Sequence, residues 1–241
     1  MWARLIFGGC AAVALTCAAA VPSFATRPAA NNLAYEENFG HGHAALFGSH
    51  EVYSQSTWRF AQWTEMLARS AVETKDAQHL CTTQTETQCT PPEWQALLDR
   101  MRGLDLRQQI DIANDAMNRH PYVPTMQNWH RSMYWETAFE FLRRGGQCQD
   151  YAIAKYLLLR AAGVPAELMR MVVLRDAAIG LDHAILAVYV DGEPLLLDNL
   201  RADIVPAAGV GYYHPYYSIN ETGWWFHFGG QSMTRVAANY R

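Results

Sequence analysis

Near residue 163 the hydrophobic residues of this chain change their period. Before that point apolar residues recur at helical spacing, most clearly from Cys148 to Ala162, a segment that Gly163 and Pro165 end. Beyond it, Leu168 to Leu174 and Ala184 to Val190 are short apolar runs typical of strands. A chain that forms helices first and antiparallel strands afterwards predicts an α+β domain with a helical N-terminal half.

The strand region contains one strong turn signal. Asp191-Gly192 separates Ala184–Val190 from Leu195–Leu197, and Asp-Gly is a preferred pair for two-residue hairpin turns. The aromatic stretch from Tyr212 to Phe228 predicts one or two further strands. Upstream, helical spacing indicates amphipathic helices after Ser54, after Pro91-Pro92 and from Leu104 to Met117.

The first 25 residues differ in kind from the rest. Arg4 precedes an uncharged run from Leu5 to Val21, and Ser23 and Ala25 are small residues at positions that a signal peptidase reads. We expect residues 1–25 to be a signal peptide for export, with an uncleaved anchor as the alternative. Residues 26–50 are rich in Gly, Asn and Ala and are expected to form a flexible arm, and residues 51–241 the folded domain.

Composition and cysteine content narrow the function. Half of the residues are hydrophobic and the formal net charge is only -4, so the chain is globular and nucleic acid is not an expected partner. Three cysteines follow the signal peptide. In an oxidising compartment Cys81 and Cys89 should form a disulfide, which leaves Cys148 unpaired. An unpaired cysteine in an exported protein is a candidate reactive thiol, or else a buried inert one.

The setting of Cys148 favours reactivity. It follows Gly145-Gly146 at the start of a predicted helix, where unpaired backbone N–H groups and the helix dipole favour thiolate over thiol. With a two- or four-residue turn in the hairpin, His183 and Asp198 share one face as diagonal neighbours about 7 Å apart at Cα. Cys148, His183 and Asp198 are therefore candidates for a nucleophile, a base and an orienting carboxylate. The alternative is that His183 only ends a strand and Asp198 only begins a turn.

Four motifs carry a resemblance to a known family. They are Gly145 to Tyr156 (GGQCQDYAIAKY), Leu159 to Pro165 (LRAAGVP), Asp182 to Val188 (DHAILAV) and Pro194 to Leu200 (PLLLDNL). The chain resembles the bacterial transglutaminase-like cysteine proteinases, the LapG family, from about Trp94 to Phe228. The resemblance implies a papain/transglutaminase-like fold, with the nucleophile at a helix N-terminus that packs on an antiparallel sheet. It also implies a periplasmic cysteine endopeptidase with Cys148, His183 and Asp198 as its triad.

The resemblance further implies a substrate and a regulator. Members of the family release large surface adhesins, and so control biofilm attachment, by cutting near the adhesin N-terminus at sites of the Ala-Ala-Gly type. An inner-membrane cyclic di-GMP receptor sequesters the protease through its periplasmic domain. The same fold also hosts cysteine amidases and acyltransferases, and a non-catalytic binding module is a third hypothesis.

This sequence departs from the family beside the nucleophile. Relatives have acidic residues on both sides of the cysteine, where they help to bind calcium, whereas here Gln147 and Gln149 leave Asp150 as the nearest carboxylate. Calcium depends on carboxylate charge for affinity, so we expect weak or no calcium binding and no required cofactor. Gln147, Trp135 and Asn199 are further candidates for the cleft or the oxyanion hole. For Trp135 core packing, and for Asn199 turn capping, is the alternative.

Overall fold

The structure is a computed structural model that describes residues 43–76, 79–83 and 89–229. The predicted signal peptide lies outside these residues. The helices are α1 (Ala61–Asp76), α2 (Pro92–Met101), α3 (Leu106–Asn118), α4 (Thr125–Trp129), α5 (Ala138–Arg144) and α6 (Cys148–Ala161). The strands are β1 (His50–Ser54), β2 (Met169–Asp176), β3 (Leu181–Val190), β4 (Glu193–Leu197), β5 (Val205–Pro206), β6 (Tyr213–Ile219) and β7 (Trp224–Phe228).

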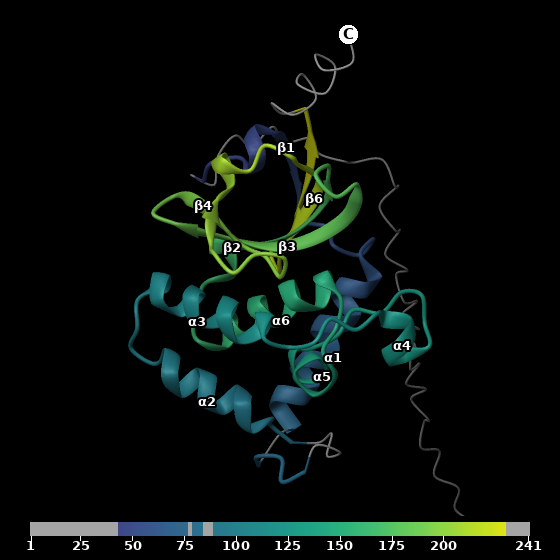
Figure 1. The fold of residues 1–241 in the computed structure, drawn as a ribbon, viewed down its shortest axis with the longest axis vertical. Coiled ribbons are helices and arrows are strands. Elements are labelled where there is room, and N and C mark those ends of the chain that lie inside the picture. The colour runs from purple at the N-terminus through teal and green to yellow at the C-terminus, as the bar shows by residue number, and fades with distance from the viewer. Residues whose placement is uncertain (1–42, 77–78, 84–88, 230–241) are drawn as a thin grey trace, which may run out of the picture. The chain divides into compact units, whose positions relative to one another are not determined.

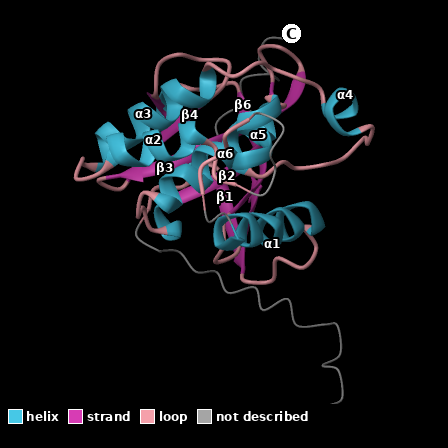
Figure 2. Ribbon diagram, turned by 90° about the horizontal axis from the view of Figure 1, so that it is seen from below, coloured by secondary structure: helices cyan, strands magenta, loops and turns pink. Residues whose placement is uncertain are grey.

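All of the strands join one antiparallel sheet with the order β1-β7-β6-β2-β3-β4-β5. The sheet curls, and the helices lie against its outer face, with α6 and α3 next to β2 and β3 (Figure 1). Seen from below, the helices cover the strands (Figure 2). The predicted α+β class with a helical N-terminal half is confirmed.

Alternation of side chains gives the sheet two apolar faces. Along β3, Ala184, Leu186 and Val188 belong to the cluster that packs with α6. Ile185 and Tyr189 belong to a second cluster on the opposite face. Helix α6 is buried almost all round, because helices cover one of its sides and the sheet the other. The first residue of α6 is therefore held by a rigid element.

Local signals explain where several helices begin. Helix α3 starts with a capping box, in which Asp105 accepts from the Gln108 backbone N–H at 2.8 Å and Gln108 accepts from the Asp105 N–H at 3.3 Å. Helix α2 starts at Pro92, as predicted from the Pro91-Pro92 pair. Helix α5 has a second capping box between Thr137 and Glu140. The patterns in the sequence indicate neither this helix nor α4 and β1.

The boundary predicted for the flexible arm is wrong at its C-terminal end. Most of residues 26–50 lie outside the described residues, but residues 43–50 are part of the fold. Leu46 is fully buried in the second apolar cluster. Ser49 Oγ forms a hydrogen bond with His227 Nδ1 at 2.8 Å. His50 begins β1, which pairs with β7. The composition of the segment does not reveal this order, because His227 and Phe228, the partners of Ser49 and His50, lie almost 180 residues away in the sequence.

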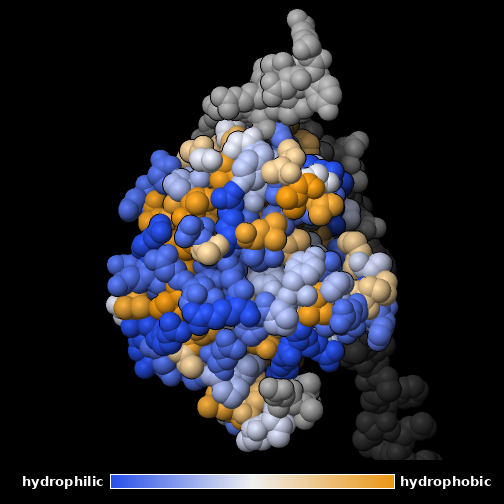
Figure 3. Space-filling model, in the orientation of Figure 1, coloured by the Kyte–Doolittle hydropathy of each residue, from blue (hydrophilic) through white to orange (hydrophobic). Residues whose placement is uncertain are grey.

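The face of the molecule seen in Figure 3 is mostly hydrophilic, with separate hydrophobic patches. Such a surface fits helices that turn their apolar sides inward, as the buried Ile110, Ala113 and Met117 of α3 show. No helix in the described part of the chain combines the length and the apolar character needed to cross a membrane.

Candidate active site

The turn between α5 and α6 strongly favours glycine. Gly145 has φ 68° and ψ −178°, and a Cβ there would lie 2.1 Å from the Pro121 carbonyl oxygen. A Cβ on Gly146 would lie 2.6 Å from the Asp150 Cβ. The turn therefore packs closely against the Pro121 backbone on one side and the Asp150 side chain on the other. This packing fixes the position at which α6, and with it Cys148, begins.

Asp150 holds the start of α6 from inside. Its side chain is fully buried, and its carboxyl accepts from the backbone N–H groups of Glu136 at 2.9 Å and Gln147 at 2.8 Å. Burial, and then the charge of Glu136, raise the pKa of Asp150 to about 8. Cys148 is the first residue of α6 and is partly exposed. Its thiol lies beside first-turn N–H groups that have no acceptor within the helix.

The hairpin has the register that the two-residue turn predicts. Asp191 and Gly192 both have positive φ, 52° and 85°, as a type I′ turn requires. Leu186 pairs with Leu197 and Val190 with Glu193. His183 lies near the start of β3, and Asp198 directly follows β4.

His183 and Asp198 form a close buried pair. The imidazole Nε2 lies 2.8 Å from Asp198 Oδ1, and the two side chains are 4% and 0% exposed. Burial alone would lower the pKa of His183, but hydrogen bonds with Asp198 and with the Cys148 thiol raise it to about 9. Burial alone would raise the pKa of Asp198, but His183, Tyr213 and the Leu200 N–H hold it below its usual value. The imidazole thus lies between a thiol and a carboxylate.

Two groups that hold Asp198 were missed in the sequence. The Tyr213 hydroxyl donates to Asp198 Oδ2, and the Leu200 N–H donates to Oδ1 at 2.9 Å. Tyr213 belongs to β6 and lies in the aromatic stretch that predicted only strands. Strand pairing between β2 and β6 brings it to the site. No local pattern marks a contact of this kind.

This geometry suits nucleophilic chemistry at a carbonyl group. A thiol beside an imidazolium can ionise, and a carboxylate on the far nitrogen fixes the ring and favours its protonated form. The first turn of α6 places backbone N–H groups beside the sulfur, where negative charge would develop on a carbonyl oxygen. The arrangement is that of a cysteine hydrolase or acyl transferase.

Comparison with protein families decides between such enzymes. The model of the bacterial transglutaminase-like cysteine proteinases (BTLCP) matches residues 72–233. The chain belongs to this family. It is a cysteine protease of the LapG type and acts on a protein substrate, so the resemblance found in the motifs is confirmed.

Solved structures from Legionella pneumophila are similar to this proteinase over most of their length. LapG in its calcium-bound form is 28% identical with a TM-score of 0.52, and the match covers 60% of this chain and 87% of LapG. A second LapG structure is 29% identical with a TM-score of 0.52, and the match covers 61% of this chain and 82% of LapG. An EGTA-treated LapG structure is 30% identical with a TM-score of 0.52, and the match covers 59% of this chain and 80% of LapG. Among curated protein sequences no significant match was found. The papain/transglutaminase-like fold expected for the proteinase is that of these relatives.

The remaining candidate residues take different places. The Gln147 side chain accepts from the Thr125 backbone N–H at 3.2 Å, so it bridges to α4. Trp135 packs against the main apolar cluster. Asn199 is partly exposed, and its Oδ1 makes no hydrogen bond with the described residues. None of these contacts links them to the Cys148 sulfur.

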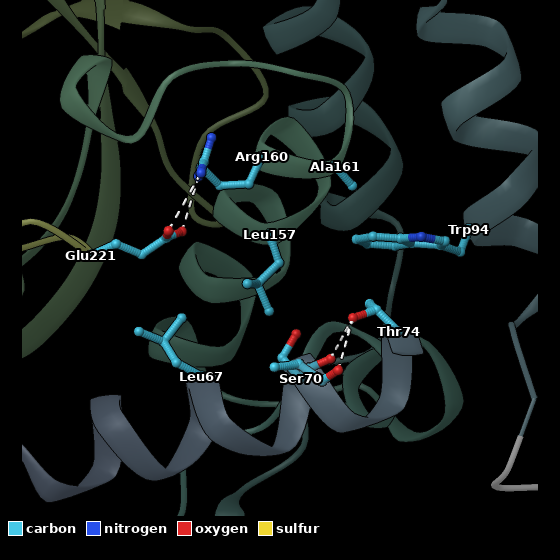
Figure 4. Close-up of a pocket in the computed structure, with 9 residues that line it drawn as sticks. Leu67, Ser70, Thr74, Trp94, Leu157, Arg160, Ala161 and Glu221 are labelled. Carbon is cyan, nitrogen blue, oxygen red and sulfur yellow. Dashed lines mark hydrogen bonds and ion pairs between the residues drawn. The ribbon is translucent and has the colours of Figure 1, made fainter. Parts of the chain in front are cut away.

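Two features of the proteinase lie apart from Cys148. Cys81 and Cys89 form the disulfide, with Cα atoms 5.1 Å apart. A pocket of about 530 Å³ lies between α1 and α6. Figure 4 shows Arg160 and Glu221 paired on one wall of it and Trp94 on another. The pocket lies by the C-terminal half of α6, whereas Cys148 begins that helix, so the pocket does not hold the Cys148 thiol.

Proposed function

We propose that this proteinase is a periplasmic endopeptidase with a triad of Cys148, His183 and Asp198. The observation that carries the proposal is the His183 ring, held by Asp198 at 2.8 Å on Nε2 and near enough to the Cys148 thiol for that thiol to raise the pKa of the imidazole. With Nε2 bound to the carboxylate, Nδ1 is the ring nitrogen free to exchange a proton with the sulfur.

The reaction follows from these positions. The Cys148 thiolate attacks the carbonyl carbon of the scissile amide, and N–H groups at the start of α6 stabilise the negative oxygen. The His183 imidazolium gives its proton to the leaving nitrogen as the C–N bond breaks, which leaves an acyl-enzyme thioester. The neutral imidazole then takes a proton from water, whose oxygen attacks the thioester. The acid product and the thiolate–imidazolium pair result. Asp198 keeps the ring oriented throughout.

We propose a large surface adhesin as the substrate. The support is the resemblance of the four motifs and the similarity to LapG over 87% of that chain. Cleavage near the adhesin N-terminus, at a site of the Ala-Ala-Gly type, would release the adhesin and control biofilm attachment. An inner-membrane cyclic di-GMP receptor is the proposed regulator, and residues 1–25 are the proposed export signal.

The test uses the purified protein and the N-terminal region of such an adhesin. We expect a single cut in small-residue sequence, seen as two fragments whose masses add up to the substrate plus one water. Cys148→Ala should abolish the cut, and Asp198→Asn should slow it. Deamidated or cross-linked product in place of two fragments would instead indicate amidase or acyltransferase chemistry. Full cleavage by Cys148→Ala would refute the proposed nucleophile.

We propose that calcium binds weakly or not at all beside Cys148. One LapG structure is described as calcium-bound, but the donors here fit the ion poorly. Gln147 and Gln149 are neutral, and Gln147 Oε1 already accepts from Thr125. The Asp150 carboxyl already accepts hydrogen bonds from backbone N–H groups. Burial raises its pKa to about 8, so the carboxyl is mostly uncharged at pH 7. The mechanism therefore takes no step through calcium.

Calorimetric titration with calcium chloride tests this proposal. We expect no heat of binding for the natural sequence. The double variant Gln147→Asp/Gln149→Glu should gain affinity, because it adds two carboxylates. Micromolar affinity in the natural protein would overturn the proposal.

A further inference from the structure

A buried lysine lies two helical turns below the nucleophile. Lys155 belongs to α6, seven residues after Cys148, and is fully buried. The whole sequence contains only two lysines, and the other, Lys75, is exposed on α1. Removing an ammonium group from water is costly unless charge and hydrogen bonds compensate, and an apolar side chain would fill the same space more cheaply. Lys155 therefore calls for an explanation other than packing.

The Lys155 ammonium group has a neutral hydrogen-bond partner and is influenced by the charge of Asp198. Its Nζ donates to Asn114 Oδ1 on α3 at 2.8 Å. Asn114 is neutral, so the compensating charge comes from elsewhere. Burial lowers the pKa of Lys155 to about 7, while the charge of Asp198 opposes this effect. The charge of the Asp198 carboxylate thus favours the charged forms of both Lys155 and His183.

Two asparagines on one face of α3 connect Lys155 to the loop that carries Asp198. Asn118 Nδ2 donates to the carbonyl oxygens of Asp198 at 2.8 Å and Arg201 at 3.0 Å. Asn114 Nδ2 donates to the Ala202 carbonyl at 3.1 Å. The side-chain amides of Asn114 and Asn118 therefore hold the loop from Asp198 to Ala202. The Lys155 ammonium group in turn donates to the amide oxygen of Asn114. We call Lys155, Asn114 and Asn118 the α3–α6 clamp.

We propose that Lys155 is a positioning residue, which through the α3–α6 clamp and the charge of its ammonium group keeps the Asp198 carboxylate aimed at His183 Nε2. This inference rests on the triad proposed above. Lys155 is fully buried and its ammonium group donates to Asn114, so it acts on the reaction through Asp198. Its loss lets the 198–202 loop shift and makes the imidazolium less stable, because displacement of a catalytic group by even 1 Å can reduce a rate by about 100-fold.

The test measures alkylation of Cys148, which needs no knowledge of the substrate. Iodoacetamide is added at pH 6.5, and the modified Cys148 peptide is quantified by mass spectrometry over time. Lys155→Met is expected to lower the rate constant by about tenfold. Lys75→Met, the matched control on exposed lysine, should react like the natural protein. Thermal unfolding of each variant is followed by circular dichroism.

A double-mutant cycle separates positioning from general structural support. If Lys155 acts through Asp198, then adding Lys155→Met to Asp198→Asn causes no further loss of rate. An equal loss in both backgrounds, or no loss in the single variant, overturns the proposal while the triad stands. An Asp198→Asn variant that reacts as fast as the natural protein instead refutes the proposed triad.

Asn118→Ala keeps the test decisive where Lys155→Met does not fold. Asn118 is only partly buried, and its replacement removes the hydrogen bonds to the loop without burying a new group. The same non-additivity with Asp198→Asn is expected. A slower reaction that persists unchanged in the Asp198→Asn background contradicts the role of the clamp.

Discussion

Replacement of Gly145 by alanine tests whether the turn before Cys148 is held as tightly as the structure indicates. Backbone at φ 68° and ψ −178° is nearly closed to residues other than glycine and costs about 1–3 kcal/mol when another residue occupies it. The new Cβ would also lie 2.1 Å from the Pro121 carbonyl oxygen, so one of the two chain segments must move.

That movement breaks further contacts. The Gly146 N–H donates to Pro121 O at 3.3 Å, and the Val123 N–H donates to Gly146 O at 3.0 Å. Each hydrogen bond is worth about 1 kcal/mol net. The substitution should therefore cost about 3–5 kcal/mol, which lowers the melting temperature by roughly 6–20 °C for a domain of this size. It should also slow alkylation of Cys148, three residues further along.

Two other glycines provide matched controls. Gly163 has φ 98° but open space around its Cβ position, so Gly163→Ala should cost only about 1–2 kcal/mol. Gly209 has neither a positive φ nor a neighbour within 4 Å, so Gly209→Ala should have almost no effect. The three variants are compared by thermal unfolding under one condition. If Gly145→Ala melts no lower than Gly163→Ala, the close approach to Pro121 is not a real constraint.

Three further predictions concern the site and the disulfide. The pKa of His183 is raised to about 9, so the stability from its pair with Asp198 should be fully present below pH 6.5 and be lost as the pH rises through 9. Urea unfolding from pH 6 to pH 10 should show this loss of stability. A free energy of unfolding that does not change over this range would contradict the prediction. Tyr213→Phe removes the hydrogen bond to buried Asp198, so it should lower the free energy of unfolding by about 1.5–3 kcal/mol and change kcat more than KM. The control Tyr212→Phe should change neither the stability nor the kinetics. Equal kinetics in both variants would rule out a role for the Tyr213 hydroxyl. Cys81→Ser/Cys89→Ser opens the disulfide loop and should cost about 2–3 kcal/mol in thermal unfolding, and added reductant should destabilise the natural protein but not this variant.

The local sequence was sufficient for the central geometry of the site. Asp191-Gly192 specifies a two-residue turn, and that turn sets the register which brings His183 near Asp198. The glycines before Cys148 indicate that one helix ends and another begins there, so the start of α6 was predicted at the correct residue. These predictions succeed because turn conformation and helix ends depend on neighbouring residues and their backbone preferences.

Contacts between distant segments were decided only by the tertiary structure. Tyr213 reaches Asp198 because β6 pairs with β2, and Leu46 is buried because it packs on residues of β2, β3 and β6. Lys155 resembles any polar position of a helix until α6 packs against α3 and its ammonium group meets Asn114. Side-chain periodicity says which face of a strand or helix is apolar, but it does not say which element covers that face. The chain by itself therefore determined that Cys148 begins a helix and that a hairpin brings His183 near Asp198, and packing between distant segments determined what holds them in place.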